Sequence, residues 1–247
     1  MKFDPFHDFD TRGYLRNAFG EKDPDIVRHL EHSCFIAGIS EAFRYLSAIP
    51  NIRYHDVLHT HKLLFRDLYP WAGQNRLQTA PDIAVSKGSV LFAHPKDAEA
   101  AVDYALKIGS NKAVMANQPG EVMGYLAYGH PFLDGNGRTI MVVHAELAER
   151  AGISIHWAAT SKSAYLAALS EEIDHPGKGH LDAYLKPFMR EPIGVEQMEG
   201  NITGTHGLDG RANVSADENT VLGNVSASEL KARYEEHRLR RRETGER

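Results

Sequence analysis

The segment His130–Arg138 constrains the fold of this chain more than any other stretch. It reads His-Pro-Phe-Leu-Asp-Gly-Asn-Gly-Arg, and a run suited to a helix lies on each side of it. The run over residues 121–128 is ended by Gly129, and the run over 139–151 ends at Gly152, a common helix terminator. Apolar residues dominate the first half of the second run, so we expect most of its surface to be buried. The sequence thus predicts two helices joined by a tight loop.

Each polar side chain of this loop suits a polyphosphate bound to a divalent metal. His130 can take a proton from an attacking hydroxyl group, and Asp134 can ligate Mg²⁺ through oxygen. The glycines beside Asn136 let backbone amides approach phosphate oxygens, and Arg138 can hold a phosphate with several donors. The free amides and dipole at the start of the second helix also favour an anion. A plain turn is the alternative for Gly-Asn-Gly alone, but a turn does not need the three charged or titratable side chains at these offsets.

The rest of the chain carries mainly helical apolar patterns. They predict helices over residues 24–48, 54–69, 96–108, 112–117, 120–129, 138–151, 161–173, 181–189 and 226–242. Strand signals are few, and the best are two short runs that flank Lys87-Gly88 and predict one hairpin. We therefore expect an all-α fold, a helical bundle with one β-hairpin, followed by a polar carboxyl-terminal appendage.

Composition narrows the class of protein further. Of the 247 residues, 42% are hydrophobic and 25% are charged, values that are ordinary for a soluble protein with a sizeable core. The net charge of −5 argues against direct nucleic-acid binding, and no apolar stretch approaches the ~20 residues of a membrane span. The single cysteine, Cys34, excludes an internal disulfide. Because the first residues do not resemble a signal peptide, we expect a cytoplasmic protein, with delivery into another cell by a dedicated secretion system as the alternative.

A change of composition after residue 192 suggests three parts. Residues 1–192 hold the helical patterns and the hairpin. Residues 193–225 become rich in Gly, Asn, Ser and Thr, and we interpret them as a linker or a small appendage. Residues 226–247 are interpreted as a basic carboxyl-terminal helix that begins with a capping box. Its arginine-rich end, residues 238–242, is interpreted as a solvent-exposed face, with a transport signal or an acidic partner as the alternative.

The string His130–Arg138 resembles the signature of the Fic family, His-x-Phe-x-Asp/Glu-Gly-Asn-Gly-Arg-x-x-Arg, at every position except the last. Residues 63–76 are similar to the end of the family's helix before its active-site flap. The stretch Ser86-Lys87-Gly88, followed by Phe92 and His94-Pro95, resembles the flap itself. This resemblance covers residues 14–190. It implies a Fic-type helical bundle in which the predicted hairpin is the flap.

The resemblance also implies an activity, that of a protein adenylyltransferase (an AMPylator). Such an enzyme moves AMP from ATP to a Tyr, Thr or Ser hydroxyl of a target protein with the help of Mg²⁺. His130 is then the general base, and Asp134 holds the metal. The resemblance assigns nucleotide and phosphate contacts to Gly135, Asn136, Gly137, Arg138 and Tyr165. Because the family's flap pairs with an extended segment of the target, it assigns target docking to Ile83, Ala84, Val85, Ser86, Lys87 and Gly88.

Met141 departs from the family signature, which has a second arginine at this position. That arginine is associated with the terminal phosphate and with an inhibitory glutamate, and methionine can serve neither. Glu199 is the nearest match to the inhibitory glutamate, and a separate small antitoxin protein, as in toxin–antitoxin members of the family, is the other source of inhibition. Two alternatives stay open: an enzyme with another nucleotide or phosphate-containing donor, and a catalytically weak module that binds nucleotide or a partner.

Overall fold

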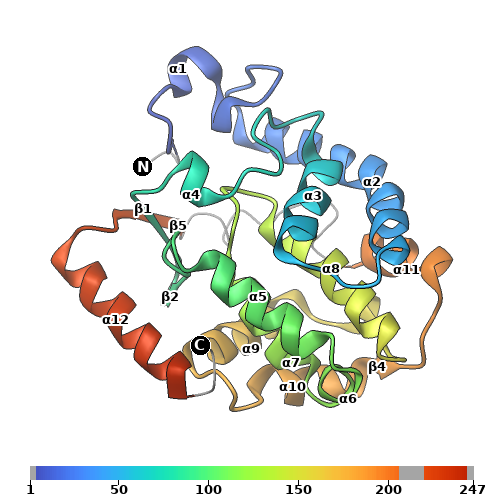
Figure 1. The fold of residues 1–247 in the computed structure, drawn as a ribbon. Coiled ribbons are helices and arrows are strands. Elements are labelled where there is room, and N and C mark those ends of the chain that lie inside the picture. The colour runs from blue at the N-terminus through green and yellow to red at the C-terminus, as the bar shows by residue number, and fades with distance from the viewer. Residues whose placement is uncertain (1–3, 206–219, 244–247) are drawn as a thin grey trace.

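The computed structural model describes residues 4–205 and 220–243, which form mainly helices (Figure 1) and confirm the predicted fold class. The longer helices are α2 (Pro24–Ala48), α3 (Tyr54–Phe65), α5 (Ala98–Gly109), α7 (Pro119–Gly129), α8 (Asn136–Arg150), α9 (Lys162–Asp174), α11 (Val195–Thr203) and α12 (Ser228–Glu243). Shorter helices are α1 (Phe9–Arg12), α4 (Arg76–Thr79), α6 (Lys112–Asn117) and α10 (His180–Leu185), with 3₁₀ turns at Tyr14–Arg16, Trp157–Ala159 and Lys186–Phe188. The strands are β1 (Ile83–Lys87), β2 (Val90–Leu91), β3 (Ser154–Ile155), β4 (Met189–Arg190) and β5 (Thr220–Asn224).

Helices α7 and α8 form the centre of the molecule, on either side of the predicted loop. Helix α7 is buried along almost its whole length and packs against α5, α9, α10 and α8. Such close packing requires small residues, because a Cβ atom on Gly120 would lie 2.3 Å from the amide nitrogen of Asp182. A Cβ atom on Gly129 would lie 2.6 Å from a methyl group of Val102. The two ends of α7 are therefore fixed against neighbouring helices, which in turn fixes where the loop begins.

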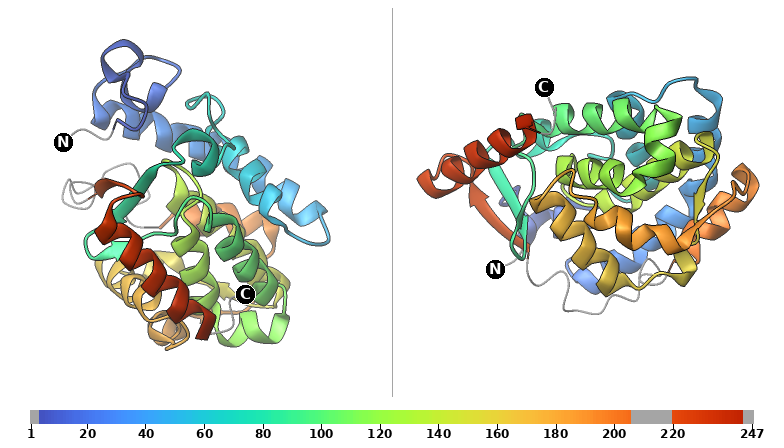
Figure 2. Two further views of the ribbon diagram at one scale, coloured as in Figure 1. Left: turned by 60° about the vertical axis from the view of Figure 1, so that its left-hand side comes forward. Right: turned by 90° about the horizontal axis from the view of Figure 1, so that it is seen from below.

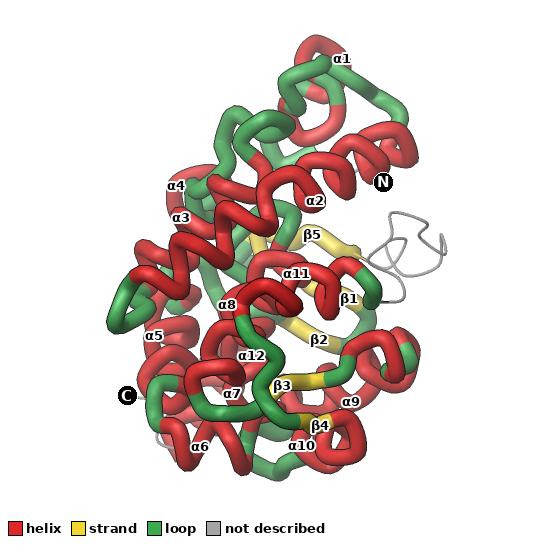
Figure 3. The backbone as a smooth tube through the Cα atoms, turned by 90° about the vertical axis from the view of Figure 1, so that its right-hand side faces the viewer, coloured by secondary structure: helices red, strands yellow, loops and turns green. Residues whose placement is uncertain are grey.

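Helix α2 is the longest helix of the described residues and runs along the outside of α3, α8 and α11 (Figure 3). It begins at Pro24, and the side chain of Asp23 caps it by accepting a hydrogen bond of 2.9 Å from the amide of Asp25. At Gly38 the backbone of α3 comes so close that a Cβ atom would lie 2.4 Å from the carbonyl oxygen of Leu63. The inner face of α2 thus packs directly against the helices that carry the loop.

The predicted hairpin is present, but it belongs to a larger sheet than the sequence indicated. Strands β1 and β2 pair antiparallel, with Ser86 opposite Leu91 and Gly88 at the turn with a φ of 58°. Strand β5 pairs antiparallel with the other edge of β1, so that the strand order is β2-β1-β5. Strands β3 and β4 form a second, two-stranded sheet. Local patterns could not predict β5 or β4, because their partners are distant in the sequence.

The division of the chain into three parts stays a prediction. The structure does show helices α11 and α12 and strand β5 after residue 192. Within the expected linker, α11 places Met198 and Ile202 in the main hydrophobic core, so this part packs against the body. Helix α12 lies within the predicted basic helix and runs beside the strands at the edge of the body (Figure 2). Residues 1–3, 206–219 and 244–247 of the three expected parts lie outside the described residues.

The start of α12 differs from the predicted capping box. The side-chain oxygen of Asn224 accepts a hydrogen bond of 2.8 Å from the amide of Ser226, and its carbonyl accepts one of 2.9 Å from Ala227. An asparagine turn therefore leads from β5 into the helix. Across the part of the chain that the structure describes, none of the helices combines the length and the apolar character that a membrane span requires.

Candidate active site

The loop between α7 and α8 has a sharply bent backbone at both ends. His130 ends α7 in the left-handed region, with φ 40° and ψ 57°, and Gly135 precedes α8 with φ 74°. A side chain on Gly135 would be strained by this φ, and its Cβ atom would lie 2.6 Å from the ring of Phe65. By contrast, Gly137 is exposed, and its position faces open space. The second glycine therefore leaves room at the start of α8.

Asn136 closes the loop onto itself. Its side-chain oxygen accepts a hydrogen bond of 2.9 Å from the amide of Phe132, and its side-chain nitrogen donates one of 2.8 Å to the carbonyl of the same residue. The ring of Phe132 is fully buried in the core. Both polar atoms of its side chain thus bind the loop backbone, and its contact with a phosphate stays a prediction. The structure thus gives Asn136 a role in shaping the loop.

His61, on α3, stabilises the loop by a hydrogen bond to the loop backbone. Its Nδ1 atom accepts a hydrogen bond of 2.9 Å from the amide of Gly73, which makes Nε2 the donor to the carbonyl of Asp134 at 3.1 Å. The ring is buried and stacks on Phe132, with 3.8 Å between the ring centroids. Burial lowers the pKa of His61 to about 3, so the ring is neutral and keeps this tautomer. No local pattern indicates this role, since Gly73 and Asp134, the two partners of His61, are distant from each other along the chain.

Arg76 connects the loop to the hairpin. Its side chain is fully buried and donates hydrogen bonds of 2.7 Å to the carbonyl of His130 and 2.6 Å to the carbonyl of Ala93. A longer bond of 3.4 Å reaches the carbonyl of Ile83, at the start of β1. Burial lowers the pKa of Arg76 to about 10, which still leaves the guanidinium charged at neutral pH. Arg76 closes the block 63–76 that resembles the family, but its contacts could not be read from that resemblance.

The ring of His130 lies against the hairpin. It stacks on Phe92, which follows β2, with 3.8 Å between the centroids and 14° between the planes. Burial lowers the pKa of His130 well below its ordinary value, and the positive charges of Arg76 and Lys87 lower it further. The imidazole is therefore neutral at pH 7 and can accept a proton. The stacking on Phe92 places the end of the hairpin beside the histidine.

Arg138 is paired with a carboxylate that the sequence analysis did not single out. Its Nη1 atom lies 2.5 Å from Oε2 of Glu31 on α2, and both side chains are largely buried. Burial by itself would lower the pKa of Arg138, but Glu31 and, to a smaller extent, Asp134 raise it overall. Within the described residues, the buried Nε atom of Arg138 and the buried Oε1 atom of Glu31 have no hydrogen-bond partner. Glu31 thus satisfies only part of the hydrogen-bonding capacity of Arg138.

Asp134 suits the role of a magnesium ligand. Its side chain is half-buried, and its Oδ1 atom accepts a hydrogen bond of 2.7 Å from the amide of Gly135, the next residue of the loop. Mg²⁺ usually binds proteins through one or two carboxylates together with substrate phosphates. One carboxylate near the exposed residue Gly137, in the first turn of α8, fits that pattern.

The remaining predicted residues lie further from the loop's polar groups. Met141 is 5% exposed and belongs to the hydrophobic core. The ring of Tyr165, on α9, packs against Trp157 with 5.5 Å between centroids, so its contact with a base stays a prediction. Glu199, on α11, accepts a hydrogen bond from Ser40. Ser40 lies nine residues after Glu31 on α2, or roughly 13 Å along the helix, so an inhibitory role of Glu199 also stays a prediction.

The predicted target-docking residues form β1 and the turn that follows it. Ala84 and Val85 are buried, whereas Lys87 and Gly88 are exposed. All five residues of β1 are opposite residues of β5 on the edge that β2 does not use. The edge that we expected to receive a target segment is therefore already paired within the chain.

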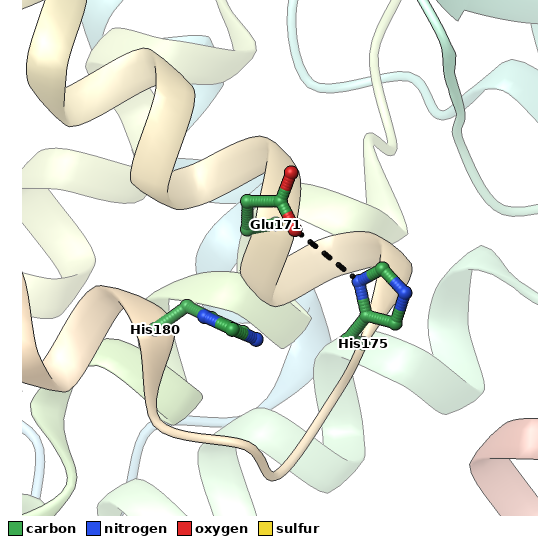
Figure 4. Close-up of side chains that lie close together, drawn as sticks. All are labelled: Glu171, His175 and His180. Atoms are coloured by element: carbon green, nitrogen blue, oxygen red, sulfur yellow. Dashed lines mark ion pairs between the residues drawn. The ribbon is translucent and has the colours of Figure 1, made fainter.

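A separate group of metal-binding side chain types lies at the junction of α9 and α10 (Figure 4). Glu171, His175 and His180 each offer one ligand atom, and these atoms lie within 4.8 Å of one another. Nδ1 of His175 is 3.4 Å from the carboxylate of Glu171. All three side chains are exposed, so water competes for any ion here, and we assign no metal to this group.

The fold and the loop together define a helical domain of the Fic type, with a flap hairpin beside a histidine and a helix amino terminus. Residues 51–148 match the model of the Fic/DOC family, which confirms the resemblance. The chain is similar to the protein adenylyltransferase VbhT of Bartonella schoenbuchensis, with 32% identity over 165 residues. That match covers 62% of this chain but only 32% of VbhT, about a third of its length.

Further similarity is found to a second relative and to solved structures. The chain is 29% identical to the probable protein adenylyltransferase y4lH of Sinorhizobium fredii over 165 residues, which are 63% of this chain and 81% of y4lH. Among solved structures, it resembles BepC from Bartonella tribocorum with bound AMPPNP, with 18% identity, a TM-score of 0.57 and coverage of 75% and 99% of the two chains. It also resembles a Fic domain from Bartonella quintana with bound ADP, with 20% identity, a TM-score of 0.59 and coverage of 77% and 99%. At these identities the solved structures establish the fold.

Proposed function

We propose that this chain transfers AMP from ATP to a Tyr, Thr or Ser hydroxyl of a target protein. The observation that carries the proposal is the position of a neutral His130 at one end of the loop, with the exposed residue Gly137 and the side chain of Arg138 at the other. Two relatives that are named protein adenylyltransferases, and two similar structures that contain an adenine nucleotide, support the choice of reaction and donor.

The reaction forms one bond and breaks one bond at the α-phosphorus. The hydroxyl oxygen of the target attacks this phosphorus, and its proton passes to the imidazole of His130. The bond between the α-phosphorus and the oxygen that leads to the β-phosphorus then breaks, and pyrophosphate leaves. Because the imidazole is neutral, it can accept the proton without first losing one. Phe92 fixes the plane of the ring by stacking, and Arg76 fixes the backbone of His130 through its carbonyl.

The start of α8 binds the phosphates in this proposal. The amides of the first turn and the dipole of the helix attract the negative charge, and Gly137 leaves the approach open. Arg138 would bind the distal phosphates through guanidinium N–H groups that Glu31 does not occupy. Asp134 would hold Mg²⁺, which neutralises charge on the phosphates when it is bound. Positioning and charge neutralisation supply most of the acceleration in such reactions.

The test is intact-protein mass spectrometry after incubation of the full chain and a cell lysate with Mg²⁺ and ATP. We expect a mass increase of one AMP group on a target or on the chain itself, and its loss in His130→Ala. The matched control is His29→Ala, which changes an exposed histidine on α2 and leaves the reaction unchanged. Transfer that survives His130→Ala contradicts the proposed mechanism. Parallel reactions with GTP, CTP and UTP identify the donor.

A second function, a module that binds nucleotide without efficient transfer, is favoured by Met141. Its side chain is buried where the family signature has an arginine. We predict that Met141→Arg increases self-modification with ATP, because position 141 lies three residues after Arg138 and shares its face of α8. Met141→Leu is the control for the buried position. Tight nucleotide binding without transfer in either form would establish the binding module instead.

Three further expectations belong to this proposal. The partners would be a target protein with an accessible hydroxyl and, as in toxin–antitoxin members of the family, a small antitoxin. BepC and the Bartonella quintana protein are described as effectors that a secretion system translocates. For this chain, such delivery stays the alternative to a cytoplasmic location.

A further inference from the structure

Strand β5 occupies the whole outer edge of β1. The register places Ile83 opposite Asn224 and Lys87 opposite Thr220, and a hydrogen bond of 3.0 Å from the amide of Val225 to the carbonyl of Asp82 extends the pairing. The backbone donors and acceptors along one edge of a strand pair with one neighbouring strand at a time. A second extended segment can therefore use this edge of β1 only after β5 has left it.

Helix α12 anchors β5 by binding the hairpin itself. Tyr234 is buried in a small apolar cluster with Ala84 of β1 and Leu91 of β2. The guanidinium of Arg233 donates a hydrogen bond of 3.0 Å to the carbonyl of Ser89 at the hairpin turn. Arg238 forms an ion pair with Asp97, at a distance of 2.7 Å. The strand and the helix thus bind the hairpin as one unit.

The basic end of α12 binds the body of the domain. Arg241 is buried, donates a hydrogen bond of 2.8 Å to the carbonyl of Ile173 and lies 3.3 Å above the ring of Tyr128. Arg240 donates one of 2.9 Å to the carbonyl of Asp174. Both carbonyls belong to the last turn of α9, where positive charge is favourable. We expected the arginine-rich end of this helix to be exposed to solvent. Two of its arginines, Arg240 and Arg241, instead fix α12 to the body of the domain.

The hairpin that carries the paired edge is fixed relative to His130 from the side of β1 where β2 lies. Phe92, the residue after β2, stacks on the ring of His130, and the charge of Lys87 at the end of β1 reaches the same ring. Arg76 binds the carbonyls of both His130 and Ile83. A strand on β1 is thus held at a fixed position relative to the histidine, whether it comes from this chain or from a target.

We propose that residues 220–243 are a removable strand-and-helix plug on the target-docking edge of the flap. This inference rests on the proposed function, because it assigns the edge of β1 to the target. The partner that this surface fits is an extended segment of about the length of β5, which pairs through its backbone and makes little demand on sequence. A tethered strand acts at an effective concentration on the order of millimolar, so a target competes with β5 poorly until α12 is released.

The test is a disulfide bond between β1 and β5 that oxidation forms and reduction breaks, and we call it the lock. We would replace Ile83 and Asn224 by cysteine in the full chain with Cys34→Ser, which removes the only native cysteine. The neighbouring pair Asp82–Val225 is hydrogen-bonded, so Ile83 and Asn224 form a non-hydrogen-bonded pair. The Cα atoms of such pairs are about 4.5 Å apart, within the range of about 4.4–6.8 Å that a disulfide spans. Failure of this disulfide to form under oxidation would overturn the register and the proposal.

The readout that needs no nucleotide is binding of a fluorescein-labelled peptide with the sequence of residues 220–225, followed by anisotropy. We expect no binding to the oxidised protein and recovered binding after reduction. Tyr234→Ala combined with Arg238→Ala should tighten binding at least ~10-fold relative to the native chain. Leu239→Ala, which changes a side chain that is 61% exposed on the same helix, should bind as the native chain does. Equal binding to the oxidised and reduced forms would overturn the proposal.

The second readout is transfer of AMP to a target protein by the same forms. We expect transfer to be lost on oxidation and regained on reduction. Transfer that is equal in both forms contradicts the plug and leaves the proposed function intact. If no form transfers AMP while peptide binding follows the lock, the proposed function is wrong and β5 still controls the edge. Should the double variant fail to fold, the disulfide alone decides the result.

Discussion

The guanidinium of Arg138 lies 2.5 Å from the carboxylate of Glu31, and this ion pair joins the start of α8 to the first half of α2. Both side chains are largely buried, so each has lost most of its contact with water. A buried ion pair offsets this loss only if the partners remain close. A phosphate that binds Arg138 must therefore share the guanidinium with the carboxylate of Glu31 or displace that carboxylate.

We predict that Glu31→Gln strengthens nucleotide binding. Glutamine keeps the shape of the side chain and can still accept a hydrogen bond from Arg138, but it removes the negative charge that competes with a phosphate. We expect the dissociation constant for ATP to fall about fivefold, which corresponds to ~1 kcal/mol. Isothermal titration calorimetry measures this directly.

Glu41→Gln is the matched control for this change. Glu41 lies on the same helix, and its carboxylate forms an exposed ion pair of 2.7 Å with Arg66. Exposed pairs contribute little, so nucleotide affinity should be unchanged. Weaker binding by Glu31→Gln would instead mean that the carboxylate holds Arg138 in position for the phosphate.

The two glycines of the loop should respond differently to alanine. Gly135→Ala forces a side chain into a left-handed backbone and against Phe65, and we expect it to lower the free energy of unfolding by about 3 kcal/mol. Gly137→Ala meets open space within α8 and should change stability by less than ~1 kcal/mol. Its Cβ atom should nevertheless weaken nucleotide binding. Urea unfolding together with calorimetry separates the two effects, and equal destabilisation by both would be incompatible with this geometry.

Arg76→Lys should loosen the hairpin and the loop together. A lysine keeps the charge, but a single ammonium group cannot serve the carbonyls of His130, Ala93 and Ile83 at once. Buried acceptors without partners cost about 1–3 kcal/mol each, so we expect destabilisation of about 3 kcal/mol. Hydrogen exchange should speed up over residues 83–93. Arg66→Lys, at an exposed ion pair, is the control and should change little.

Stability should fall at acidic pH because His144 is buried in its neutral form. Burial lowers the pKa of His144 to about 4, and its Nε2 atom is 2.8 Å from the carbonyl of Pro119. The folded pKa is below the unfolded value of 6.5, so the stabilisation is complete above pH 6.5 and is lost progressively as the pH falls toward 4. Each pH unit in this window costs ~1.4 kcal/mol for the histidine. Urea unfolding of His144→Gln at pH 7 and 5 should show a shallower dependence than the native chain, and parallel curves would show that His144 does not cause it.

The sequence alone was sufficient to predict the fold class and the order of the polar side chains along the loop. The helical repeats, the glycines and prolines that interrupt them, and the string from His130 to Arg138 act over a few residues, so their consequences can be read locally. The helix ends confirm this, since α7 and α8 meet the loop at Gly129 and Asn136. The hairpin β1–β2 was also predictable, because its two strands are adjacent in the sequence.

Only the tertiary structure decided which partners these groups have. Glu31 reaches Arg138 from another helix, His61 supports Asp134, Arg76 links His130 to the hairpin, and β5 returns to cover β1. Residues far apart in a sequence leave no periodic signal of their contact, since packing of the whole core determines it. A basic helix that looks exposed in the sequence can thus become the element that holds a strand on the flap.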